Sequence, residues 1–193
     1  MLEEPELIKS CSAGERAAQE ELYTRYAARV LTCCRRYCDN EEDAEDILQD
    51  TFLIAFDRIS SFSYRRNGSL QAWLCRIAVN QAVDRIRKRR RLPVPVGISE
   101  KEDVEAPQEE ALERIPPEKL LGMIAALPEM RRAVFNLYCM DGYSHREIGK
   151  MLGISEKGSA SMLAKARNQL RRAIKQYTKE QEEYGTLGKH HQE

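Results

Sequence analysis

The sequence predicts an all-α protein in which two small helical domains are joined by a flexible acidic linker. Apolar residues recur three or four positions apart over most of the 193 residues, as on the buried face of a helix. Five prolines and seven acidic residues fall between positions 92 and 117, where they oppose a packed core. We therefore assign residues 1–91 to a first domain, 92–117 to the linker, 118–178 to a second domain and 179–193 to a flexible tail.

The first two helices of the first domain are predicted from capping residues. Ser12 and Glu15 have the spacing of a capping box, which predicts a long helix ending near Cys38. Asn40 is expected to cap the second helix, because its side-chain oxygen can accept a backbone N–H bond there. The acids that follow Asn40 suit the positive end of that helix.

A third helix is predicted to follow a polar loop. Residues 60–68 are polar and aromatic, which is typical of a loop, and Ser69 is expected to cap the helix behind it. Trp73 lies among aliphatic residues at helical spacing, so we assign it to the core. The helix then continues into a basic segment, residues 85–91.

The second domain carries the pattern of a helix-turn-helix. Ser144 and Glu147 form a second capping box before a short apolar helix. Gly153 supplies a turn, and Ser155 is expected to cap a longer helix with several basic residues. A short helix, a glycine turn and a longer basic helix are typical of a DNA-binding element.

Charge is segregated along the chain although its formal total is zero. Seven acids and no Lys or Arg fall between Asp39 and Asp50, whereas six of the seven residues from Arg85 to Arg91 are basic. One surface therefore suits a cationic partner and another suits nucleic acid. This division favours a protein that bridges DNA and a second protein.

Other classes of function lack support in the sequence. The six cysteines have no CxxC spacing, and Cys34 and Cys38 have no further ligands to complete a zinc site, so we expect buried thiols in a reducing compartment and no metal or cofactor. A divalent metal on the acids of the second helix would likewise need further ligands. We find no catalytic triad or phosphate-binding loop, no secretory signal and no membrane-spanning run, and expect a cytoplasmic protein that is not an enzyme.

Taken in order, the motifs resemble those of bacterial RNA polymerase sigma factors over some two-thirds of the chain. Region 2 is matched by three segments: residues 21–23 (Glu-Leu-Tyr), 43–52 and 72–80. Region 4 is matched by six short segments: residues 127–128, 132–135, 143–144, 147–149, 152–155 and 166–167. Two regions in this order with a short linker are similar to the extracytoplasmic-function (ECF) group.

The resemblance implies that the acidic helix binds the clamp helices of the largest subunit of core RNA polymerase. The residues expected to make this contact are Asp46, Gln49, Asp50, Phe52 and Phe56. The carboxylates and the amide share one face and suit Arg or Lys, and the two rings would add apolar contact. A solvated acidic helix start is the plain alternative.

The resemblance also implies that promoter DNA is opened by capture of a flipped base at the minus-ten element. The residues expected to bind this DNA are Phe62, Tyr64, Asn67, Arg76, Asn80, Asp84, Arg87 and Lys88. The rings would stack on a base, and an amide such as Asn80 can bond to a base edge unless it is simply a surface asparagine. The basic segment would bind phosphates with little sequence preference.

Region 4 is expected to bind the minus-thirty-five element in the major groove and the polymerase flap. The residues expected to contact this element are Ser155, Lys157, Ser159, Ser161, Lys165 and Arg167. Here the chain departs from its relatives: Gly158 weakens the start of the helix, and Ala160 stands where relatives often carry a cation. The promoter sequence therefore does not carry over.

These observations favour a sigma factor that binds core polymerase, recognises promoter DNA and melts it, and the resemblance implies an anti-sigma factor as a further partner. A stand-alone helix-turn-helix regulator is the alternative, but it leaves the acidic helix and the aromatic loop unexplained. A degenerate relative that binds polymerase or a sequestering protein without promoter specificity is a third possibility, supported only by the altered recognition helix.

Overall fold

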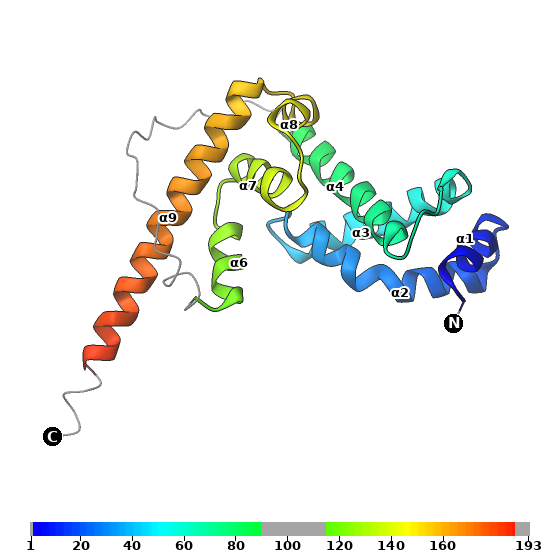
Figure 1. Ribbon diagram of the computed structural model, residues 1–193, viewed down its shortest axis with the longest axis horizontal. Coiled ribbons are helices and arrows are strands. Elements are labelled where there is room, and N and C mark those ends of the chain that lie inside the picture. The colour runs from blue at the N-terminus through cyan, green and yellow to red at the C-terminus, as the bar shows by residue number, and fades with distance from the viewer. Residues whose placement is uncertain (1, 90–114, 188–193) are drawn as a thin grey trace. The chain divides into compact units, whose positions relative to one another are not determined.

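The computed structural model describes residues 2–89 and 115–187, and every regular element within those ranges is helical. This confirms the predicted all-α fold. The chain divides into two compact units, the first ending at Leu92 and the second beginning at Pro93 (Figure 1). Most of the predicted linker lies outside the described residues.

The first unit is a bundle of four α-helices. They are α1 (Glu4–Ser12), α2 (Arg16–Arg35), α3 (Glu41–Arg58) and α4 (Ser69–Arg89), with a 3-10 turn η1 (Ile59–Ser61) after α3. The helices α2, α3 and α4 pack against one another around aliphatic side chains such as Leu22, Ile47 and Leu74. The helix α1 packs on α2 and η1.

The start of this bundle differs from the sequence prediction. Ser12 ends α1, and its hydroxyl donates back to the carbonyl oxygen of Ile8 over 2.7 Å, so it caps no following helix. The helix α2 begins at Arg16 after Glu15, whose side chain makes no capping bond. The spacing of Ser12 and Glu15 was misleading because Gly14, with a φ of 80°, turns the chain between two helices.

Asn40 behaves as predicted at the start of α3. Its Oδ1 atom accepts a bond from the backbone N–H of Asp43 over 2.7 Å. Ser69, by contrast, is the first residue of α4, and the N–H of Ala72 donates to the carbonyl oxygen of Gly68. Gly68, with a φ of 83°, therefore precedes α4 at the position predicted for a serine cap.

Over residues 115–187, the described part of the second unit, the elements are α6 (Pro117–Ala125), α7 (Glu129–Phe135), a π-helical turn η2 (Asn136–Met140), α8 (His145–Leu152) and α9 (Glu156–Leu187). Its core gathers Val134, Leu137, Ile148 and Leu152 against the first turns of α9. The helix α9 continues to Leu187, past residue 178, where the sequence analysis placed the end of the domain.

Candidate functional site

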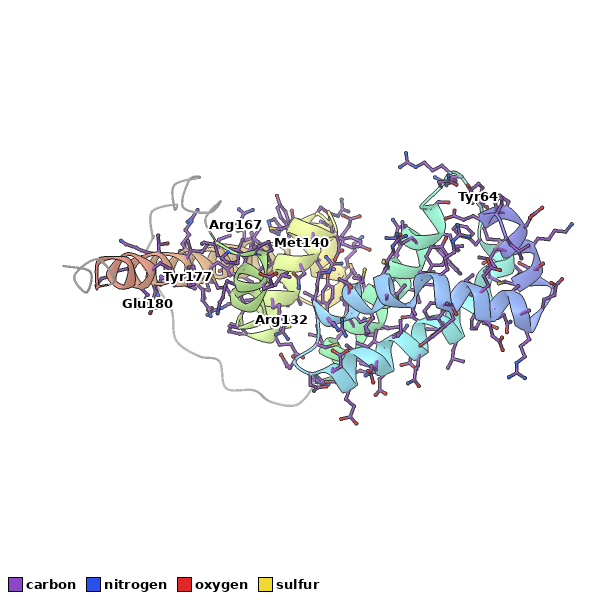
Figure 2. The ribbon with its side chains drawn as sticks, turned by 90° about the horizontal axis from the view of Figure 1, so that it is seen from below. Tyr64, Arg132, Met140, Arg167, Tyr177 and Glu180 are labelled. Carbon is purple, nitrogen blue, oxygen red and sulfur yellow. The ribbon has the colours of Figure 1, made fainter. Side chains whose placement is uncertain are left out.

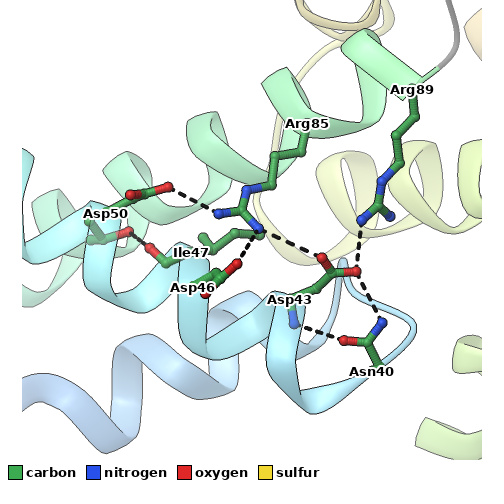
Figure 3. Close-up of polar contacts among 8 residues, drawn as sticks. Asn40, Asp43, Asp46, Ile47, Asp50, Arg85 and Arg89 are labelled. Carbon is green, nitrogen blue, oxygen red and sulfur yellow. Dashed lines mark hydrogen bonds and ion pairs between the residues drawn. The ribbon is translucent and has the colours of Figure 1, made fainter.

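The acidic face of α3 is bound to α4 within the first unit. The guanidinium group of Arg85 reaches three carboxylates (Figure 3). The nitrogen-to-oxygen distances are 3.7 Å to Asp43, 3.5 Å to Asp46 and 3.0 Å to Asp50. Since these acids lie three and four positions apart, they share one side of α3 and repel one another unless a cation lies between them.

Arg89 adds a second cation to the same face. Its Nη2 atom donates to Asp43 over 2.7 Å, and Asn40 donates to the same carboxylate over 3.1 Å. The pKa of Asp43 is lowered, first by the bond from Arg89, and burial opposes this only in part. Arg85 and Arg89 of the basic segment are thus ion-paired with α3, and Arg89 is at the same time exposed, whereas residues 90 and 91 lie outside the described residues.

Two further cations of that segment are exposed on the same helix. Arg87 and Lys88 are exposed on α4, and Arg87 is paired with Asp84 one turn earlier over 2.8 Å. Arg76 and Asn80 are also exposed on α4. The polar residues expected to bind DNA on this helix thus lie on its surface, apart from Asp84, which is partly covered.

Phe52 does not lie where the sequence analysis placed it. Its side chain is only 3% exposed, and its ring packs 4.7 Å from that of Tyr23 and 5.9 Å from that of Phe56. It belongs to the core, so it offers no contact to a partner in this conformation. The prediction was wrong because Phe52 follows Leu48 by one turn and shares its buried side of α3.

Leu53 takes the outward place on α3 that was expected of Phe52. It is 68% exposed and follows the exposed Gln49 by one helical turn. The spacing of Asp46, Gln49 and Leu53 in the sequence already places them on one side of a helix. The sequence analysis chose the aromatic residues Phe52 and Phe56 as the apolar contacts instead of Leu53. Asp46, Gln49 and Leu53 therefore form an exposed stripe, to which Phe56 is only partly open.

A cavity of about 740 Å³ lies between the loop after η1 and the start of α4. Eleven residues line it: Ser61, Phe62, Ser63, Arg65, Arg66, Asn67, Gly68, Ser69, Ala72, Trp73 and Arg76. The cavity thus combines aromatic surface, hydroxyl and amide groups and three cations. This set suits a base with its adjoining phosphates.

The aromatic wall of this cavity is a pair of rings. Phe62 and Trp73 lie 5.0 Å apart between centroids with an angle of 38°. Trp73 is only half-buried, so its assignment to the core was wrong: it lines the cavity. Arg65 and Arg66 were missed, although their position beside the aromatic loop residues was visible in the sequence.

Two further loop residues hold each other in place. The hydroxyl group of Tyr64 donates to Oδ1 of Asn67 over 2.7 Å, and Tyr64 is exposed on the loop (Figure 2). Asn67 lines the cavity and keeps its amide nitrogen as a possible donor. Of the residues expected at the minus-ten element, the structure brings Phe62, Asn67 and Arg76 together at one cavity.

The second unit contains the predicted helix-turn-helix. The Oγ atom of Ser144 accepts from the N–H of Glu147 over 3.3 Å, and the backbone N–H of Ser144 donates to the Glu147 carboxylate over 2.8 Å. This capping box lowers the pKa of Glu147, chiefly through the side-chain bond to Ser144. Gly153 ends α8 with a φ of 66°, which favours glycine.

Ser155 and Gly158 fit together at the start of α9. Ser155 Oγ accepts from the N–H of Gly158 over 3.0 Å, as predicted for a cap. A Cβ atom at position 158 would lie only 3.1 Å from that oxygen. The glycine thus leaves room for the cap, which offsets part of its cost to the helix.

The outward face of α9 carries some of the expected contacts. Lys157, Ser161 and Arg167 are exposed, whereas Lys165 is half-buried. The guanidinium group of Arg167 lies 5.8 Å from the centre of the Tyr138 ring, which stacks in turn on His145 (Figure 2 labels Arg167). Arg167 is therefore held against the unit's surface by a cation–π contact.

Ser159 is an incorrect prediction. Its side chain is buried, and its hydroxyl shares a hydrogen bond of 3.0 Å with Nδ1 of His145. It joins α9 to α8 and has no surface to offer to a base. The neighbouring serines at 155 and 161 are exposed. Ser159 differs from them only in the side of the helix on which it lies.

Within residues 2–89 and 115–187, no helix is long and apolar enough to cross a membrane. No group of three or more His, Cys, Asp or Glu side chains there is arranged to hold a metal ion.

Two family models match the chain. The model described as Sigma-70 region 2 matches residues 22–92, and the model described as Sigma-70, region 4 matches residues 110–170. The chain is 31% identical over 169 residues to the ECF RNA polymerase sigma factor SigM of Mycobacterium tuberculosis, covering 88% of this chain and 83% of that protein. It is 28% identical over 179 residues to the ECF RNA polymerase sigma factor SigW of Bacillus subtilis, covering 87% and 95%.

Among solved structures, the chain is similar to the sigma factor RpoE of Bartonella quintana, which was crystallised with the anti-sigma factor NepR. The TM-score is 0.48 at 22% identity, over 81% of this chain and 96% of that chain. The sigma factor CnrH, bound to the cytosolic domain of CnrY, gives 0.45 at 24% identity over 88% and 95%.

Proposed function

The chain belongs to the ECF group of RNA polymerase sigma factors. From that membership we propose which of its residues bind core polymerase and which bind promoter DNA. A sigma factor binds core polymerase, recognises promoter DNA and melts it. A stand-alone helix-turn-helix regulator is set aside, because the region 2 and region 4 models match one chain in order.

We propose that the exposed stripe on α3 is the contact with the clamp helices of the largest polymerase subunit. Asp46 and Gln49 offer oxygen acceptors to basic side chains, and Leu53 adds an apolar anchor at 68% exposure. Asp50 contributes through its bond to Arg85, which also pairs with Asp46 and offsets the repulsion between the two carboxylates.

The cavity beside α4 is the observation that carries the melting function. A base flipped from the nontemplate strand would enter between the loop and α4 and stack on the Phe62 and Trp73 rings. Unstacking a base costs a few kcal/mol, and stacking on an aromatic side chain returns about 1–3 kcal/mol. Capture of a base, together with phosphate contacts, can therefore offset local melting without ATP.

Cations around the cavity would hold the strand. Arg65, Arg66 and Arg76 line it, and Arg87 and Lys88 lie further along α4. These side chains give affinity and salt dependence, while the base edge is left to donors such as the Asn67 amide. Asn80, exposed on α4, is a further base or backbone contact in this proposal.

For region 4 we propose binding of the minus-thirty-five element by the outward face of α9. Lys157, Ser161 and Arg167 are its exposed polar residues, and Lys165 supports them from a half-buried position. The polymerase flap is the second partner of this unit. The chain makes and breaks no covalent bond in any of these steps.

We also propose an anti-sigma factor as a partner. Leu121 and Met140 in the second unit are 55% and 49% exposed, and apolar side chains of this kind suit a protein partner. Extract from unstressed cells should inhibit transcription by the purified chain, and Leu121→Asp with Met140→Asp should relieve that inhibition. Equal inhibition of both proteins would rule out this surface.

The central experiment is transcription from purified core polymerase on a promoter carrying 2-aminopurine at the flipped position. The Phe62→Ala chain should open the promoter about 10-fold less well, because one stacking surface is lost. It should bind core polymerase as the unchanged chain does. Ser60→Ala, which changes an exposed residue outside the cavity lining, is the matched control. Equal opening by both variants would refute base capture in this cavity.

A further inference from the structure

Two cysteines on neighbouring helices of the first unit meet side by side. Cys33 on α2 and Cys75 on α4 are both thiols, and their sulfur atoms share a hydrogen bond of 2.7 Å. A disulfide bond is about 2.05 Å long, so the sulfurs need to approach by only about 0.7 Å to form one. A second contact between the same helices, Arg29 to Gln71 over 3.0 Å, holds them together one turn away.

These two thiols differ from the two buried cysteines in their access to solvent. Cys33 and Cys75 are half-buried, whereas Cys11 and Cys34 are buried. Burial is also the first cause that raises the pKa of Cys11 to about 11 and that of Cys34 to about 12. A small oxidant therefore reaches the Cys33–Cys75 pair more readily than these two.

We propose that Cys33 and Cys75 are a site of reversible oxidation, at which hydrogen peroxide converts the two thiols to a disulfide. The bond would cross-link α2 to α4. It would enclose α3 and the loop that lines the promoter cavity. Cys75 directly precedes Arg76, one of the residues that line this cavity, so the modification falls on the helix that carries the proposed melting function.

The chemistry balances with peroxide as the only co-reactant. The Cys33 thiolate attacks one peroxide oxygen, the O–O bond breaks, and a sulfenic acid and one water form once a proton is taken up. The Cys75 sulfur then attacks the Cys33 sulfur, the S–O bond breaks and a second water leaves. In total, two thiols and one peroxide give one disulfide and two waters.

The two sulfurs are close enough for either one to resolve a sulfenic acid formed on the other. The pKa of Cys75 is raised above its ordinary value, first by its hydrogen bond with Cys33 and then by burial. Attack by Cys33 followed by Cys75, or in the reverse order, gives the same disulfide.

The test uses the full-length chain with a Cys34→Ala change, because trypsin leaves Cys33 and Cys34 on one peptide, residues 30–35. After hydrogen peroxide and alkylation, that peptide should appear joined to residues 67–76 with the loss of two hydrogens, and dithiothreitol should separate them. Cys75→Ser should abolish the cross-link. Cys38→Ser, which changes the other half-buried thiol, should leave it intact.

A second readout does not depend on peptide mapping. The oxidised chain should unfold at a temperature higher by roughly 5 °C or more than the reduced chain, because the cross-link closes a long loop. The Cys33→Ser and Cys75→Ser chains should show no such rise. A cross-link through Cys38, or a Cys33 sulfinic acid without any cross-link, would overturn the proposal.

Discussion

Arg85 donates from Nη2 to the Asp50 carboxylate over 3.0 Å and so ties α4 to α3 (Figure 3). The same guanidinium group reaches Asp46 and Asp43. In our proposal α4 faces promoter DNA and α3 faces polymerase, so one side chain links the two proposed binding faces.

The first prediction concerns the stability conferred by Arg85. Its side chain is 28% exposed, so the solvent screens its ion pairs, and we expect Arg85→Ala to cost about 1 kcal/mol of the free energy of unfolding. The loss should appear as a melting temperature lower by about 4–8 °C for a unit of this size. Lys88→Ala, which changes an exposed cation of the same helix, is the control and should stay within about 0.5 kcal/mol.

The second prediction separates the neighbours Phe52 and Leu53. Phe52→Ala should destabilise the first unit by about 3–5 kcal/mol, because a buried ring is removed from the core. Leu53→Ala should leave stability almost unchanged and weaken binding to core polymerase by about 10-fold, as expected of an exposed anchor. Urea unfolding measures the first effect and competition binding to core polymerase the second. The reverse pattern would restore Phe52 as a contact residue.

The sequence was sufficient for features that depend on nearby residues. The Asn40 cap, the Ser144–Glu147 capping box and the Gly153 turn are all set by neighbours within one helical turn, and each was predicted. The helix-turn-helix follows from them. Ser12 failed because the same local pattern also fits the end of a preceding helix.

Features that depend on distant residues were not predictable in the same way. Arg85 pairs with Asp50 across 35 positions, and nothing local to Arg85 distinguishes it from the outward-facing Arg87. The packing of the Phe62 ring against that of Trp73 likewise depends on how the loop folds over α4. The helical spacing of Phe52 from Leu48 predicts a buried side chain. The prediction that Phe52 contacts polymerase gave more weight to its aromatic character than to this spacing.

The third prediction concerns acid. The bond from Arg89 lowers the pKa of Asp43 below its ordinary 3.8, so the folded state holds this proton less tightly than the unfolded state. The resulting stability is present above the unfolded pKa and is lost as the pH falls through the folded pKa. The difference in unfolding free energy between the unchanged chain and Arg89→Ala should therefore be largest above about pH 5 and should narrow below pH 3.8.

Urea unfolding across this pH range, with carbon-detected NMR titration of the Asp43 carboxyl, measures the effect directly. The Asp43 pKa should rise in Arg89→Ala, because the hydrogen bond from Arg89 that lowers it most is removed. Arg87→Ala is the control, since Arg87 pairs with Asp84. An Asp43 pKa unchanged by Arg89→Ala would contradict the assignment.

The last prediction separates two residues on α9 that the sequence placed in the same role. Lys157→Ala should weaken binding to the minus-thirty-five element about equally for all sequences and reduce the salt slope by about 1, because an exposed phosphate contact is lost. Ser159→Ala should leave that slope unchanged and cost about 1 kcal/mol of stability, because its buried bond to His145 is lost. Fluorescence anisotropy over a series of salt concentrations, paired with thermal unfolding, measures both. Since Ser159 has no exposed surface, a loss of sequence preference in Ser159→Ala with unchanged stability would mean that α9 binds DNA in another conformation.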